Sequence, residues 1–328
     1  MEAGITNTID KILKKSSKKI TISNSNIKTH LPRPTLHVPS LTPHIQHLKS
    51  LKSQIITLLP HRLLTYSYSI SKCITFYNIQ DYQKTIEFAK SAIQNNAKSV
   101  KAYIYLAKAY HRTGELKLAY ENLKKAEKLT SNKHNLLDIY KETGEILQKM
   151  KQLNNAYTHL LKALNLAKEL HDTEAQGAIL NTIGTIYYNK KELDKAFDCY
   201  LDSLHLTLDK KTKANIYNNI ALIYQEKNKH KKAIKYLQKA IEIAEKEGDI
   251  HNLSIYKLNL GYIHTKQKNY KSAIKYLSEG LDGIEKLQDK YHLSIAYKYI
   301  AKFHENRKEE DLAKEYYIKS KELIENKT

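Results

Sequence analysis

The chain is poor in the residues that form metal centres and nucleophilic sites. Cys73 and Cys199 are its only cysteines, and they lie far apart without a disulfide or zinc-site spacing. We expect both to be reduced thiols in a cytoplasmic protein. There is no GxxxxGK[ST], no HExxH and no glycine-rich loop after a strand. His44 and His47 share a helical face without a nearby carboxylate. The sequence therefore predicts no enzyme, no cofactor and no metal site.

Proline and long apolar runs are also scarce. All five prolines lie between Pro32 and Pro60. Proline breaks the interior of a helix, so its absence after Pro60 is compatible with a helical remainder of the chain. No apolar run reaches the length that spans a bilayer. The first residues, MEAGITNTIDKILKKSSKK, lack the apolar core of a secretory signal. Strand patterns are absent, so we predict an all-α protein.

Acidic residues are under-represented, which gives a formal net charge of +21. No acidic residue occurs between Lys11 and Gln80, and residues 1–65 hold ten basic and two acidic side chains. Such a segment favours anionic partners, which include nucleic acid, an anionic membrane or an acidic protein. Only four basic residues are arginine. Because lysine lacks the planar fork that recognises phosphate, a solvated lysine-rich surface is the favoured interpretation for the rest of the chain.

A small residue recurs at intervals of 34 to 40 residues, which we use as a marker of an internal repeat. The markers are Cys73, Ala107, Gly144, Gly184, Ala221, Gly261 and Ala301. Twelve residues after each marker stand Thr85, Ala119, Ala156, Ala196, Ala233, Ala273 and Ala313. Nineteen residues after it stand Ala92, Ala126, Ala163, Ser203, Ala240, Gly280 and Ser320. Small residues at these offsets let two helices of a hairpin approach closely.

This pattern resembles the tetratricopeptide repeat (TPR) family. The resemblance implies an α-solenoid of about seven TPR helical hairpins that form a right-handed superhelix. The 40-residue spacing is similar to that of kinesin light chains, Pins-like adaptors and bacterial peptide-sensing regulators. The first helices of the hairpins are expected at 63–78, 99–112, 134–150, 174–189, 212–228, 251–267 and 291–307. A last helix is expected at 310–325.

Three regions follow from these patterns. Residues 1–41 form a basic arm rich in proline and serine, which we expect to be disordered. Residues 42–60 carry one apolar stripe and are predicted to form an amphipathic helix that caps the first repeat; a membrane or partner helix is the alternative. Residues 61–328 are the predicted solenoid.

The resemblance implies that ligands contact the first helix of each pair. Carried onto this sequence, the peptide-binding groove consists of Lys101, Lys108, His111, Arg112, Lys141, Asn181, Tyr188, Asn189, Asn218, Gln225, Tyr262, Lys266, Lys298 and Lys302. Glu145 and Lys149 belong to the same face. Amides can grip a peptide backbone regardless of its sequence, and the cations would select acidic groups. For Asn219 and Asn259, bonding between neighbouring helices is an equal alternative.

Three functions remain open from the sequence. The first is a non-enzymatic protein-protein interaction scaffold or adaptor whose concave groove binds an extended acidic peptide or a partner helix. The second is a regulator that contacts nucleic acid or an anionic membrane through the basic arm. The third is a peptide-sensing or signalling accessory protein, which rests on fold analogy alone. The sequence leaves the ligand and the oligomeric state undetermined.

Overall fold

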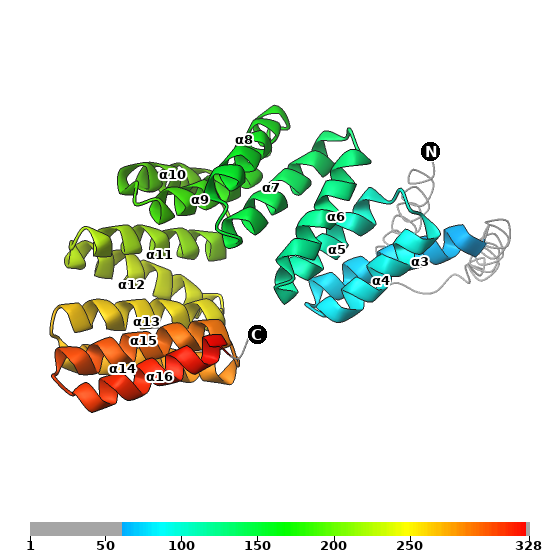
Figure 1. The fold of residues 1–328 in the computed structure, drawn as a ribbon. Helices are drawn as coiled ribbons and strands as arrows, with labels where there is room; N and C mark the ends of the chain where they lie inside the picture. The colour runs from blue at the N-terminus through cyan, green and yellow to red at the C-terminus, as the bar shows by residue number, and fades with distance from the viewer. Residues whose placement is uncertain (1–60, 326–328) are drawn as a thin grey trace, which may run out of the picture. The chain divides into compact units, whose positions relative to one another are not determined.

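The computed structural model describes residues 61–325, which belong to the unit Pro60–Thr328 (Figure 1). Within these residues the secondary structure consists of fourteen α-helices without a strand. The predicted arm at 1–41 and capping helix at 42–60 lie outside the described residues. Among the described residues, no helix has the length and apolar character needed to cross a membrane.

The helices are paired in sequence. The seven hairpins are α3 (His61–Asn78) with α4 (Tyr82–Asn95), α5 (Val100–Thr113) with α6 (Leu116–Lys128), α7 (Lys133–Lys149) with α8 (Leu153–Glu169), α9 (Thr173–Asn189) with α10 (Leu193–Leu206), α11 (Lys210–Glu226) with α12 (His230–Lys246), α13 (Ile250–Lys266) with α14 (Tyr270–Lys286), and α15 (Lys290–Asn306) with α16 (Glu310–Glu325). The predicted first helices agree with these bounds to within two residues, and the predicted last helix agrees at both ends.

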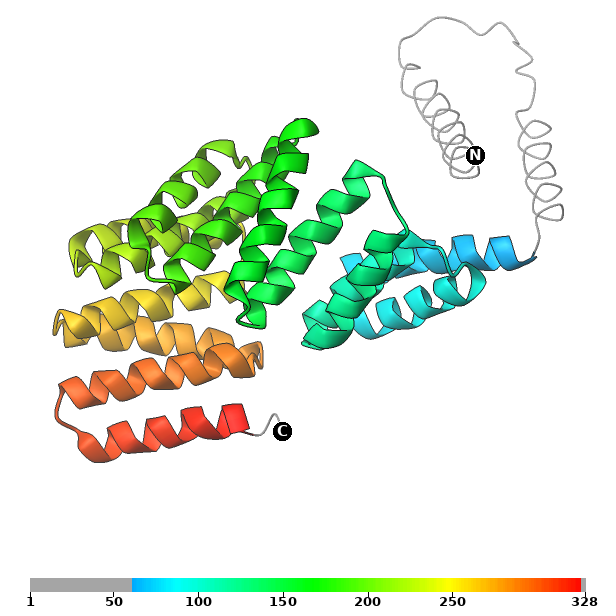
Figure 2. The same ribbon diagram turned by 45° about the horizontal axis from the view of Figure 1, so that its top comes forward.

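Successive hairpins stack on their neighbours (Figure 2). Each second helix packs against the first helix of the next hairpin, and each first helix also contacts the next first helix. In the part of the chain that the structure describes, no two second helices make comparable contact. The first helices α3, α5, α7, α9, α11, α13 and α15 therefore share one continuous face. This arrangement confirms the predicted all-α solenoid of hairpins.

The marker residues lie where the two helices of a hairpin approach most closely. All of them are buried, as are the small residues twelve and nineteen positions later. A Cβ atom added to Gly184 would lie 2.6 Å from Cε1 of Tyr200, and one added to Gly144 would lie 2.5 Å from Cγ of Leu160. Since non-bonded carbons prefer about 3.5–4.0 Å, these glycines are required for the observed helix spacing.

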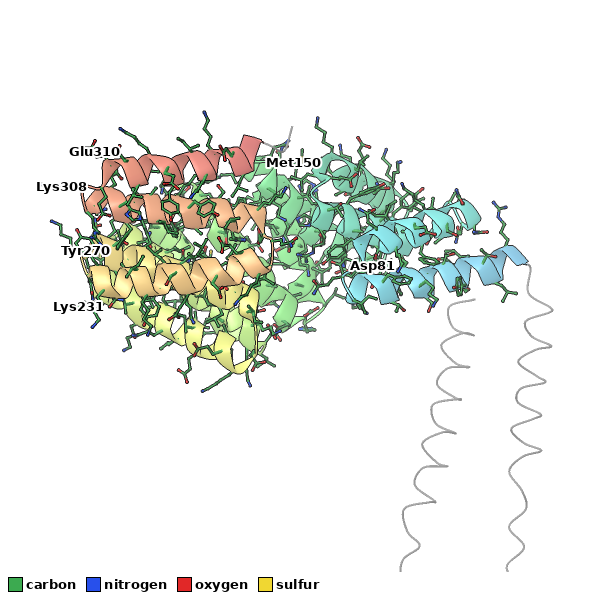
Figure 3. The ribbon with its side chains drawn as sticks, turned by 90° about the horizontal axis from the view of Figure 1, so that it is seen from below. Asp81, Met150, Lys231, Tyr270, Lys308 and Glu310 are labelled. Carbon is green, nitrogen blue, oxygen red and sulfur yellow. The ribbon has the colours of Figure 1, made fainter. Side chains whose placement is uncertain are left out.

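Most connections between helices are tight turns with one residue at positive φ. Gly114 and Gly248 supply this conformation at φ 90° and 63°, as the sequence predicts. Eight further turns use other residues: Gln80, Lys151, His171, Lys191, Asn228, Lys268, Gln288 and Lys308. Figure 3 labels Met150 and Lys308 at two of these connections. Sequence reasoning missed these eight positions because side chains other than glycine rarely adopt positive φ.

Candidate functional site

A cavity of about 230 Å³ opens on the face formed by the first helices. Its lining comes from α5, α7 and α9 and is His111, Arg112, Glu145, Gln148, Lys149, Asn181, Thr182 and Thr185. All of these side chains are polar, and they include two cations and one carboxylate besides amides and hydroxyls. Three residues of the predicted groove are thereby brought together from two repeats, His111 and Arg112 from α5 and Asn181 from α9.

A buried hydrogen-bonded pair, His111 and Glu142, lies at this cavity. His111 and Glu142 are 3% and 4% exposed, and Nδ1 of His111 lies 2.5 Å from Oε1 of Glu142. Burial opposes ionisation of Glu142, but the hydrogen bond with His111 and the charges of Lys108 and Arg112 together lower the pKa of this carboxyl. The other ring nitrogen of His111, Nε2, is buried and lacks a partner among the described residues. The pair therefore fixes α5 against α7 and orients the imidazole. The sequence analysis does not identify Glu142, because only its burial and its hydrogen bond with His111 distinguish it from other glutamates.

Glu145 and Lys149 lie one turn apart on α7 at the wall of the cavity. Burial, reinforced by the neighbouring Glu142 carboxylate, raises the pKa of Glu145. Burial and the charge of Arg112 lower the pKa of Lys149. Both shifts favour the neutral forms of these groups, as expected where charges are removed from water. An incoming charged group would find partners here that are incompletely solvated.

Asparagine side chains link the first helices beyond the cavity. Nδ2 of Asn219 donates to Oδ1 of Asn181 at 3.0 Å, and Nδ2 of Asn259 donates to Oδ1 of Asn218 at 2.8 Å. The hydroxyl of Tyr299 donates to Oδ1 of Asn259 at 3.2 Å. These bonds favour the structural interpretation of Asn219 and Asn259. Asn218 is only 8% exposed, so this predicted groove residue offers little surface to a ligand.

Aromatic rings and ion pairs occupy the same face nearer the C-terminus. Tyr262 stacks on Tyr299 with 4.4 Å between ring centroids. The hydroxyl of Tyr188 donates to Glu226 at 3.4 Å. Nζ of Lys302 donates to Glu305 at 2.6 Å, so this predicted ligand cation already has an acidic neighbour.

The predicted groove residues thus differ in accessibility. His111 and Asn218 are buried; the partly buried ones are Lys108, Lys141, Asn181, Tyr188, Gln225 and Tyr262; and the exposed ones are Lys101, Arg112, Asn189, Lys266, Lys298 and Lys302. Whether any of them contacts a peptide stays a prediction. The burial of His111 and Asn218 arises because each faces a polar partner on the next first helix, which a single-repeat pattern does not reveal.

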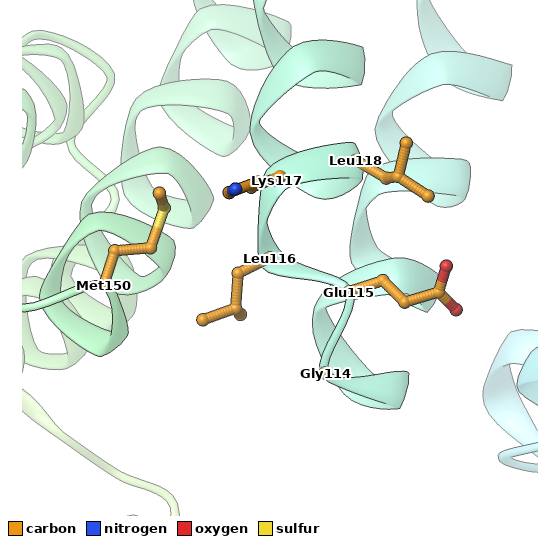
Figure 4. A pocket seen from close by; sticks show the side chains of 6 residues that line it. All are labelled: Gly114, Glu115, Leu116, Lys117, Leu118 and Met150. Carbon is orange, nitrogen blue, oxygen red and sulfur yellow. The ribbon is translucent and has the colours of Figure 1, made fainter. Parts of the chain in front are cut away.

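A second cavity, of about 530 Å³, has a different character (Figure 4). It lies at the turn between α5 and α6 and at the end of α7, and Met150 and Leu116 line it together with Gly114, Glu115, Lys117 and Leu118. None of the predicted groove residues lines it. Its lining lacks histidine, cysteine and any close pair of carboxylates, so it offers no constellation for catalysis.

The two thiols do not form a reactive site. Cys73 is fully buried and Cys199 partly buried, and both are free. Burial raises the pKa of Cys73 to about 12 and that of Cys199 to about 11. Since the thiolate is the nucleophile, both residues serve packing in the described part of the chain.

Comparison with known proteins agrees with the repeat architecture. The tetratricopeptide repeat family model matches residues 135–208 and 212–286. No curated protein sequence matches the chain.

Three solved structures share the fold at low sequence identity. The apo form of RapI is 14% identical, with a TM-score of 0.66 over 80% of this chain and 99% of that chain. Aspartyl phosphate phosphatase F from Bacillus subtilis is 16% identical, with a TM-score of 0.67 over 87% and 76%. A Rap protein complexed with competence and sporulation factor is 12% identical, with a TM-score of 0.65 over 87% and 93%. At such identities the likeness establishes the fold alone.

Proposed function

Because this chain is a tetratricopeptide-repeat protein, we propose that it is a non-enzymatic scaffold that binds an extended peptide along the first helices α5, α7 and α9. The polar cavity between these helices is the observation that carries the proposal. Its amides and hydroxyls match the alternating donors and acceptors of a peptide backbone. Arg112 and Lys149 add cations that favour an acidic side chain or a terminal carboxylate.

The location of Asn181 supports a role at this site. Its Oδ1 accepts from Asn219 on α11, which fixes the plane of the amide. No other side chain in the described residues donates to or accepts from this amide, so its Nδ2 group is available to a ligand carbonyl. Preorganisation of this kind lowers the entropic cost of binding.

A catalytic role has weaker support. One fold neighbour carries the name of a phosphatase, but the likeness covers the fold alone, and fold does not imply function. The cavity holds one imidazole, whose Nδ1 is taken by Glu142 and whose Nε2 is buried. A scaffold therefore accounts for the described residues without assigning a reaction.

The test uses a surface array of short acidic, neutral and basic peptides probed with the full chain. We expect the chain to select acidic sequences. Arg112→Ala combined with Lys149→Ala should weaken binding at least about tenfold, because each charge-assisted hydrogen bond contributes about 1.5–3 kcal/mol. Asn181→Ala should weaken all selected peptides, whatever their charge.

Lys124→Ala combined with Lys125→Ala is the matched control, since it removes the same charge from exposed positions on the second helix α6. Equal loss in both double variants would indicate a general effect of positive charge. That outcome, or the absence of any selected peptide, would contradict the proposal.

A further inference from the structure

Two histidines from successive repeats meet one carboxylate at the start of α13 and α15. Nε2 of His251 lies 2.8 Å from Oδ2 of Asp289, and Nδ1 of His292 lies 2.6 Å from the same oxygen. The imidazole rings are nearly perpendicular, at 85°, with centroids 5.2 Å apart. The nitrogen and oxygen atoms of this cluster all lie within 4.8 Å of one another.

The carboxylate is held in place by its own helix. Asp289 is the N-cap of α15, and its Oδ1 accepts from the backbone N–H groups of Tyr291 and His292, each at 3.1 Å. This arrangement turns Oδ2 toward the two rings. The side chains of His251, Asp289 and His292 are 43%, 24% and 23% exposed, so an ion from solvent can reach them.

Stacking of repeats does not require such a cluster. At the starts of the two preceding first helices, the N-cap carboxylates of Asp209 (α11) and Asp249 (α13) accept hydrogen bonds from Thr212 and Asn252 of their own helices. In the described residues, neither of these carboxylates bonds to a side chain of another repeat. Two imidazoles converging on one oxygen therefore exceed what the junction needs for packing.

We infer that His251, Asp289 and His292 form a binding site for a transition-metal ion of the Zn²⁺ class. Two imidazole nitrogens and one carboxylate oxygen suit Zn²⁺, Co²⁺ and Ni²⁺, and they are a poor set for Mg²⁺ or Ca²⁺. Three protein ligands leave the fourth tetrahedral position open to water. On binding, neutral imidazoles carry their ring protons on Nδ1 of His251 and Nε2 of His292, which frees the two facing nitrogens for the ion.

The geometry requires only a small adjustment. With metal–ligand bonds of about 2.0–2.2 Å, ligand atoms around a tetrahedral ion are about 3.4 Å apart. The two nitrogen–oxygen distances must therefore open by about 0.6–0.8 Å, which partly exposed side chains can accommodate by small torsional changes. The positive ends of the α13 and α15 dipoles oppose a cation, so we expect micromolar affinity.

A similar cluster in the described residues is formed by His111, Glu142 and Glu145, but its charged neighbours are unfavourable for binding a divalent ion. Lys108 and Arg112 lie close enough to lower the pKa of Glu142, and these cations would repel a divalent ion. Among the described residues, only His251 and His292 form ion-pair contacts with Asp289, and no lysine or arginine does. Lys108 and Arg112 thus act on the carboxylate of the first cluster, whereas the contacts of Asp289 are with the two imidazoles.

The test is a Zn²⁺ titration of the untagged full chain, after removal of metal, against a chromophoric chelator. We expect one Zn²⁺ per chain, bound with micromolar affinity. His251→Ala, His292→Ala and Asp289→Asn should each weaken binding at least tenfold, while far-UV circular dichroism stays unchanged. Replacing Zn²⁺ by Co²⁺ should give the intense visible absorption of a tetrahedral site, and His292→Ala should abolish it.

Two control variants locate the site. His159→Ala removes a partly buried imidazole on α8 and should leave affinity unchanged. The double variant His44→Ala with His47→Ala tests the other histidine pair of the sequence and should also bind normally. Failure of the wild-type chain to bind Zn²⁺, or loss of binding only in the His44/His47 variant, would overturn the inference.

Discussion

Gly184 offers a direct test of the close helix contact that defines each repeat. In Gly184→Ala the new Cβ would lie 2.6 and 2.7 Å from Cε1 and Cδ1 of Tyr200. Tyr200 is 2% exposed, and its hydroxyl donates to Thr185 at 3.2 Å, so the ring cannot turn away without losing that bond. Overpacking of this kind costs about 1–3 kcal/mol. Alanine regains about 1 kcal/mol of helix propensity, which leaves a net destabilisation of about 0–2 kcal/mol.

A double-mutant cycle separates the two contributions. Tyr200→Val removes the ring atoms that the new Cβ would meet, so Gly184→Ala should become stabilising, by about 1 kcal/mol, in that background. The control pairs Tyr200→Val with Gly144→Ala, whose nearest contacts are Leu160 atoms in the preceding hairpin. That pair should be additive.

The assay is urea unfolding followed by far-UV circular dichroism, with thermal unfolding as a second measurement. A change of 1 kcal/mol corresponds to a shift in Tm of about 2–4 °C for a domain of 150–250 residues. The reasoning would be refuted if Gly184→Ala stabilised the otherwise unchanged protein. It would also be refuted if the sign of its effect were the same with and without the Tyr200 ring.

Four further outcomes are expected. Glu142→Gln should destabilise the fold by about 1–3 kcal/mol at neutral pH, because it removes a charge-assisted hydrogen bond. The folded-state pKa of Glu142 is lowered from 4.5. The difference in free energy of unfolding between variant and wild type should therefore shrink as pH falls below 4.5, which acid unfolding curves can measure. Asn259→Leu should cost about 2 kcal/mol in urea unfolding, since it leaves the buried Oδ1 of Asn218 and the hydroxyl of Tyr299 without their partner. Lys191→Gly should leave the free energy of unfolding unchanged or raise it by up to about 1 kcal/mol, because Lys191 has φ 63°. A clear loss of stability in urea unfolding would argue against backbone strain at this residue. Deleting residues 1–41 should lower the salt concentration at which the chain elutes from heparin, and unchanged elution would reject nucleic-acid or membrane binding through the basic arm.

Much of the fold could be read from local spacing. The marker residues and their partners at twelve and nineteen positions predict each hairpin, because close helix contact restricts those sites to small side chains wherever the chain repeats. The helix bounds follow with similar accuracy, since polar turns and N-cap residues such as Asp172 and Asp249 are local signals.

The candidate site was less predictable. The ligand-contact positions of the repeat family, carried onto this sequence, identify Arg112 and Asn181, which both line the polar cavity. They also indicate Asn218 as a ligand-binding residue, whereas the structure buries it against Asn259. The offset pattern describes one repeat at a time, so it does not specify which side chains of adjacent repeats face each other.

By itself, the sequence determined a protein of stacked helical pairs with a polar face on the first helices, because side-chain size and helical period act within about forty residues. Only the tertiary structure decided that His111 meets Glu142 and that His251 and His292 meet Asp289. His111 lies 31 residues from Glu142 and His251 lies 38 residues from Asp289. Such pairs depend on how far each hairpin rotates on the one before it, and that rotation is set by packing between repeats.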